Sequence, residues 1–163
     1  MTAAVLALPK VDLRGLMRAV AHNQSNDGFS LTLFPDQWEV LGVYLQPFEL
    51  PQSQVLIEQN ATDRSLYLIE SGSLSVHYED VKGRVRLAIV GAGLVVGEGA
   101  FFSHLPRNAT VQAASTSKLW CLTPIRFAQL SNRHPGIALE LAMALGSLVS
   151  RRLVNKPKRI AVT

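Results

Sequence analysis

The sequence is poor in the residues that form disulfide bonds or bind metals. Its single cysteine, Cys121, excludes an internal disulfide and any cluster of cysteine ligands. The four histidines are far apart in the sequence, at positions 22, 77, 104 and 134. No nucleophile stands in an evident pairing with a base. We therefore expect no metal and no enzymatic activity, and in particular no metal-dependent enzyme on an all-β fold.

Long hydrophobic runs and a targeting signal are also missing. No apolar stretch approaches the roughly 18 residues of a membrane-spanning helix, and the apolar start lacks the charged region of a secretory signal. We expect a cytoplasmic protein in which Cys121 is a buried, unreactive thiol. With 163 residues, 48% of them hydrophobic and only 17% charged, the chain is too apolar for disorder and suits one globular domain.

Basic charge is confined to the C-terminal end of the chain. The net charge is +4, but five basic and no acidic residues follow Ser150, which leaves 11 basic and 12 acidic residues before it. The body is therefore not a nucleic-acid-binding surface by composition. Only about ten residues follow Leu153, too few for a helix-turn-helix, so we expect no specific DNA binding.

Helical periodicity marks both ends of the chain. Apolar residues recur at helical spacing over 13–20, and Pro35 opens a second expected helix. Near the C-terminus, Thr123 is a predicted N-cap, and a long helix is expected from Pro135 to about Val154.

Between these helices the hydrophobic period is two. Short segments rich in β-forming residues are separated by turn residues, and they lie at 55–57, 66–69, 74–78, 85–90, 109–113 and 119–122. Short strands without intervening helices predict an antiparallel sandwich or jelly-roll barrel. The expected fold class is α+β: an antiparallel β-roll with N-terminal helices, a short helix inside the roll and C-terminal helices.

The segment 96–111 interrupts this strand pattern and carries the chemistry. Gly97 and Gly99 flank the carboxylate of Glu98, and Pro106 precedes Arg107. Small residues let backbone N–H groups approach a ligand closely, and a guanidinium suits a phosphate. A carboxylate accepts hydrogen bonds from hydroxyl groups. An anion site beside a hydroxyl site suggests a nucleotide sugar-phosphate.

This segment resembles the phosphate-binding cassette of the cyclic-nucleotide-binding domain family. The matching residues are Gly97, Glu98, Ala100, Pro106, Arg107, Ala109, Thr110 and Val111. The resemblance extends from about residue 34 to 153. It departs from the family at Gly99, where leucine is usual, at Asn108, where Ala, Ser or Thr is usual, and at Ser53 and Asn60, which replace glycines. Asparagine tolerates the left-handed conformation, so the change at Asn60 is mild.

The resemblance implies a role for each cassette residue. Glu98 would bind the ribose 2′-hydroxyl and Arg107 the phosphate oxygens, beside Gly97. The amides completing the phosphate cradle would be those of Gly99, Ala100, Asn108 and Ala109. The helix 135–154 would close over the base. Arg151 or Arg152 is a candidate base cap through a cation–π contact, or is simply solvated.

We thus expect a helical extension over 1–33, a cyclic-nucleotide-binding domain over 34–154 and a basic tail over 155–163. The implied function is a sensor that binds cyclic AMP or a related cyclic nucleotide and signals by moving its C-terminal helices. It would need no cofactor, and it could form a homodimer through the helix 135–154 and act on an unidentified effector protein. The alternative is a fold that has lost its ligand, or responds to cyclic di-GMP, and acts as a protein-interaction module.

Overall fold

The computed structural model describes residues 11–23, 25 and 28–155. Its helices are α1 (Arg14–His22), α2 (Pro35–Tyr44), α3 (Glu98–Ser103), α4 (Pro124–Arg133) and α5 (Pro135–Val154). Its strands are β1 (Gln46–Leu50), β2 (Val55–Ile57), β3 (Leu66–Ser71), β4 (Ser73–Asp80), β5 (Gly83–Gly91), β6 (Val95–Val96), β7 (Thr110–Ala113) and β8 (Ser117–Leu122). The expected α+β roll is confirmed.

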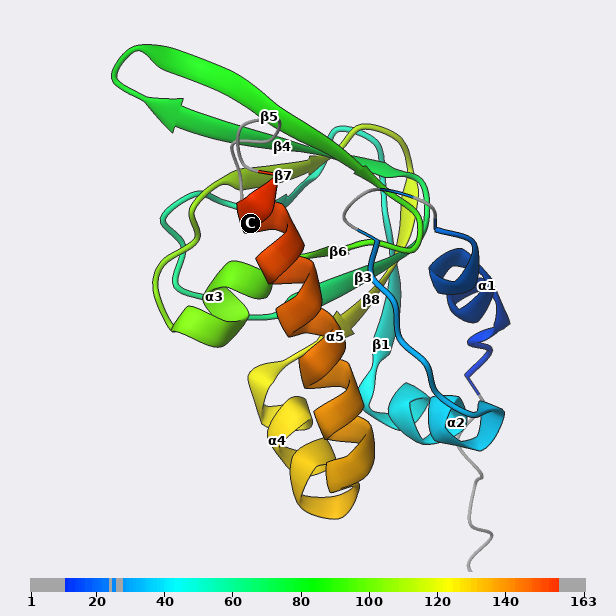
Figure 1. The fold of residues 1–163 in the computed structure, drawn as a ribbon. Helices are drawn as coiled ribbons and strands as arrows, with labels where there is room; N and C mark the ends of the chain where they lie inside the picture. The colour runs from blue at the N-terminus through cyan, green and yellow to red at the C-terminus, as the bar shows by residue number, and fades with distance from the viewer. Residues whose placement is uncertain (1–10, 24, 26–27, 156–163) are drawn as a thin grey trace, which may run out of the picture.

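The strands form two antiparallel sheets that pack face to face. One sheet has the order β1-β8-β3-β6, and the other has the order β2-β7-β4-β5. The hairpin β4–β5 extends well beyond the rest of the roll (Figure 1). Its register shifts between Val76 and His77, which is where a bulge bends a strand pair.

Alternation along the strands divides the core in two. Leu66 and Leu68 of β3 pack with the helices, whereas Ile69 packs inside the roll with strands of both sheets. On β8, Trp120 faces the helices and Leu119 faces the interior of the roll. Because successive side chains point to opposite faces, one sheet serves both clusters. The helices therefore cover the outer face of the first sheet.

The helix boundaries follow local signals in the sequence. Thr123 caps α4 by accepting a hydrogen bond from the backbone N–H of Arg126 at 3.3 Å, as expected. Pro124 and Pro135 stand in the first turns of α4 and α5, where a missing N–H costs nothing. Helix α5 runs to Val154, passes in front of the first sheet and contacts α3 (Figure 1). The end of α5 thus reaches the cassette.

Candidate functional site

The backbone of Arg107 is held by the turn that follows β2. Its N–H donates to the carbonyl of Ala61 at 2.8 Å, and its carbonyl accepts from the N–H of Asn60 at 2.8 Å. Asn60 has φ of 71° and Ser53 has φ of 72°, so both residues that replace family glycines adopt positive φ. This confirms the expected turn conformation at Asn60. The two hydrogen bonds fix the point at which Arg107 enters the roll.

The side chain of Arg107 is almost completely buried, with 2% of its surface exposed. Its Nη1 donates to the carbonyl of Gly97 at 3.0 Å, and its Nη2 donates to the carbonyl of Ser65 at 2.7 Å. The carboxylate of Asp63 accepts from Nη2 at 2.6 Å and from Nε at 3.4 Å. Arg107 therefore joins the cassette to the loop before β3. The Asp63 side chain is half exposed, so this carboxylate stands at the edge of the site.

Gly97 connects β6 to α3 as the N-cap residue of the helix. It has φ of +89°, and a Cβ atom there would lie 2.7 Å from the carbonyl oxygen of Ser65 and 2.8 Å from Nη1 of Arg107. Only glycine avoids both the strained backbone and the close contacts. Gly99 and Ala100 follow in the first turn of α3. Gly97 is therefore required for its close contact with Ser65 and Arg107. The approach of a ligand to the backbone N–H groups of this segment remains a prediction.

Glu98, the predicted ribose ligand, is completely buried. Its Oε1 accepts a hydrogen bond from Nη1 of Arg152, which lies in the last turn of α5. Nη2 of Arg152 donates to the carbonyl of Val95 at 2.9 Å. Of the two candidate base caps, Arg152 therefore contacts the cassette carboxylate itself. Arg151 is exposed and donates to the carbonyl of Gly28 at 3.2 Å, away from the cassette.

The remaining predicted site residues lie just before β7. Asn108 is exposed, whereas Ala109 is buried in the interior of the roll. The structure thus brings the Arg107 side chain to the start of α3, where Gly97 and Glu98 lie. It also adds Asp63, which sequence reasoning missed because an acidic residue in a loop 44 positions before Arg107 carries no local signal.

The apolar stripe of α5 is not available to a homodimer through this helix. Leu141, Leu145 and Leu148 are each 0% exposed within a single chain. They pack against the helical side of the first sheet because they share one face of the helix. The opposite face carries exposed apolar residues, including Leu139 and Met143. Any homodimer through α5 would use that face instead.

Two uncharged groups lie beside the site on the first sheet. Burial raises the pKa of the Tyr67 hydroxyl and that of the Cys121 thiol. Cys121 is half-buried, less than expected, but its raised pKa keeps the thiol protonated. The charge at the site comes from two ion pairs, Arg107 with Asp63 and Arg152 with Glu98.

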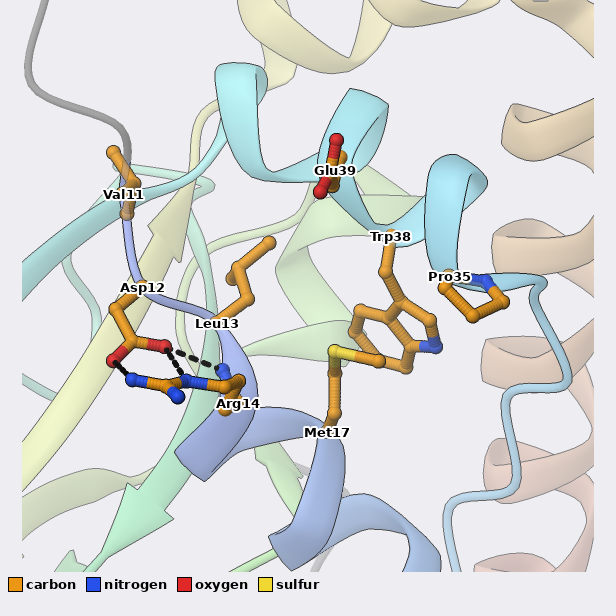
Figure 2. Close-up of a pocket in the computed structure, with 8 residues that line it drawn as sticks. All are labelled: Val11, Asp12, Leu13, Arg14, Met17, Pro35, Trp38 and Glu39. Carbon is orange, nitrogen blue, oxygen red and sulfur yellow. Dashed lines mark hydrogen bonds and ion pairs between the residues drawn. The ribbon is translucent and has the colours of Figure 1, made fainter.

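A cavity of about 440 Å³ lies away from the cassette, between the start of α1 and α2. Trp38 and Met17 extend towards each other along it, while Asp12 and Arg14 pair at its rim (Figure 2). It contains none of the predicted site residues.

Over residues 11–23, 25 and 28–155 we find no group of three His, Cys, Asp or Glu side chains able to hold a metal ion. No helix in that same part of the chain is long and apolar enough to cross a membrane.

Comparison with known proteins now identifies the fold. Residues 47–134 match the sequence model of the cyclic nucleotide-binding domain. The chain belongs to the cyclic nucleotide-binding domain family. The match includes the whole cassette, from Gly97 to Val111. The resemblance inferred from the cassette is therefore confirmed.

Solved structures agree with this fold, and the chain is also similar to part of a curated protein. A cyclic nucleotide-binding domain from Methylobacillus flagellatus superposes with a TM-score of 0.76 at 22% identity, covering 91% of this chain and 84% of that one. The regulatory domain of Toxoplasma gondii PKA, solved with cAMP, gives 0.60 at 23% identity over 88% of this chain and 48% of that one. The acetyltransferase Pat of Mycolicibacterium smegmatis is 35% identical over 86 residues, or 53% of this chain. The chain spans 26% of that relative's length.

Proposed function

We propose that this chain is a sensor that binds a cyclic nucleotide, with cyclic AMP as the first candidate, at the cassette formed by α3 and Arg107. The observation that carries the proposal is the burial of two charged side chains, Glu98 and Arg107, at the cassette positions. Burying charge is costly, and groups of buried charged side chains are enriched at functional sites. By the family resemblance, Arg107 receives the phosphate and Glu98 the ribose.

The residue after Arg107 bears on the choice of base. In the resembling family a threonine at this position often assists guanine binding, and here it is Asn108. The Asn108 side chain is exposed beside the start of β7. Asn108 therefore does not decide between adenine and guanine, and the titration described below compares the two nucleotides.

The output of the sensor is proposed to be a movement of α5. This helix contacts α3 and ends at the cassette, where Arg152 pairs with Glu98. A ligand that prefers one of two positions of α5 would shift the population towards that position. The effector that responds to α5 would then be a partner protein or a further domain.

The test is calorimetric titration with cyclic AMP, cyclic GMP and cyclic di-GMP. We expect Arg107→Ala to weaken binding of the preferred nucleotide by well over tenfold, because a buried phosphate without its cation costs about 3–5 kcal/mol. Arg133→Ala is the matched control, since it removes an exposed arginine from the end of α4. An unchanged dissociation constant in folded Arg107→Ala would refute the assignment of the phosphate site.

Glu98 is tested separately with a modified ligand. Glu98→Gln should weaken binding of the ribose nucleotide by about 1–2 kcal/mol, because a neutral amide still accepts a hydroxyl hydrogen bond without charge assistance. The 2′-deoxy nucleotide, which lacks the hydroxyl, should respond much less. An equal response of both nucleotides would show that Glu98 does not hold the sugar.

A second candidate function is a protein-interaction module that has lost its ligand. It is favoured by the pairing of both cassette charges within the chain, Arg107 with Asp63 and Glu98 with Arg152. Under this alternative none of the three nucleotides would raise the melting temperature. Under the proposed function the preferred nucleotide raises it by mass action.

A further inference from the structure

The end of α5 covers the carboxylate that the proposed function assigns to the ribose. Arg152 is 4% exposed and Glu98 is 0% exposed, and the two side chains pair directly. A hydroxyl group cannot reach a carboxylate that has no exposed surface unless a covering group moves away. Arg152 donates to Oε1 of this carboxylate, an atom that a ligand hydroxyl could also use, because a guanidinium N–H and a hydroxyl both donate to carboxylate lone pairs.

The contacts of Arg152 show how firmly it is held. Nη1 and Nη2 donate to Glu98 and to the carbonyl of Val95, but Nε is buried and has no hydrogen-bond acceptor among the described residues. A buried donor without an acceptor lowers the stability of the position that buries it. The closed position of Arg152 is therefore stabilised by the ion pair and weakened at Nε. A ligand hydroxyl could therefore replace Arg152 as the donor to Glu98.

We propose that Arg152 is an internal competitor for Glu98, a latch that holds the last turn of α5 over the cassette until a ligand hydroxyl displaces it. This inference rests on the proposed function and adds its regulation. Displacing Arg152 removes the buried partner of the last turn of α5, whose neighbours Leu153 and Val154 are exposed. Ligand binding at Glu98 would thereby free the end of α5, which is 54 residues away along the chain.

The test compares Arg152→Met with Arg133→Met in the full chain. Methionine keeps an apolar stem without the charge, and Arg133 is an exposed arginine in the last turn of α4. We expect Arg152→Met to bind cyclic AMP at least about fivefold more tightly than the wild type, since the coupling between a switch and a ligand typically changes affinity by about 5–150-fold. Arg133→Met should match the wild type. Equal or weaker binding by Arg152→Met would overturn the latch.

Amide exchange without ligand gives a second readout. Arg152→Met and Glu98→Gln should each accelerate exchange in the last two turns of α5, whereas Arg133→Met should not. Unchanged exchange in Arg152→Met, together with normal binding of cyclic AMP, overturns the latch and leaves the proposed function standing. Absence of binding in both the wild type and Arg152→Met refutes the competition together with the proposed function. Binding by Arg152→Met alone supports both.

Discussion

Replacing Gly97 by alanine should destabilise the fold at the cassette. The residue has φ of +89°, and the new Cβ would meet the carbonyl of Ser65 at 2.7 Å and Nη1 of Arg107 at 2.8 Å. Forcing an L-residue into this backbone region costs about 1–2 kcal/mol. The clash also displaces the Arg107 donor from the Gly97 carbonyl, a charged hydrogen bond worth about 1.5–3 kcal/mol. We expect the free energy of unfolding to fall by about 2–4 kcal/mol, since the displacement is only partial.

Two other glycines separate the causes of this loss. Gly83 has φ of +125°, and a Cβ atom added there would meet nothing within 4 Å, so Gly83→Ala reports backbone strain alone. Gly146 lies inside α5 and is equally open, so Gly146→Ala should stabilise the chain by about 0.5–1 kcal/mol. The assay is equilibrium urea unfolding followed by circular dichroism. If Gly97→Ala costs no more than the roughly 1–2 kcal/mol of backbone strain alone, the close approach of Gly97 to Arg107 is unimportant and the reasoning fails.

Three further predictions test other parts of the molecule. Gly15→Ala should destabilise the chain in urea unfolding despite its helical position, because its Cβ would overlap the Glu70 carboxylate, which is held by the indole N–H of Trp120. Cys121, whose pKa is raised by burial, should be alkylated by iodoacetamide at a pH of about 8.5 more slowly in the folded chain than in urea. Burial and the nearby Arg84 lower the pKa of His77, so the folded chain binds its proton less readily than the unfolded chain. Stability should therefore fall as pH drops through the histidine's ordinary range near about 6.5, and Arg84→Gln should raise the His77 pKa in an NMR titration.

The parts of the fold that could be predicted from sequence depend on local periodicity and local caps. Alternation located β2 at its observed residues and marked most of β3, β4, β5, β7 and β8, because each strand presents one face to a core. The prolines and Thr123 placed the starts of α4 and α5. These signals lie within a few residues of the structure that they specify. They survive folding because tertiary packing agrees with them.

The strands that were missed lack such a signal. β1 contains Pro47, which usually argues against a strand, but β1 stands at the edge of its sheet, where a missing N–H is tolerated. β6 is only two residues long, Val95–Val96, and its existence depends on pairing with Tyr67 and Leu68 of β3. Neither strand could be predicted from its own residues, because each depends on hydrogen bonds to a neighbouring strand of the sheet.

The same distinction explains the candidate site. The cassette residues share one short segment, so their spacing could be recognised, whereas the partners of its charges come from far along the chain. Asp63 is 44 residues from Arg107, and Arg152 is 54 residues from Glu98. Sequence reasoning could offer Arg152 only as a base cap or a solvated residue, because the last turn of a helix commonly carries basic side chains that suit the helix dipole. Its contact with Glu98 depends on how far α5 extends across the first sheet. A family cassette can thus be recognised from its own residues, whereas the partners of its two buried charges come from a distant loop and from the end of a distant helix.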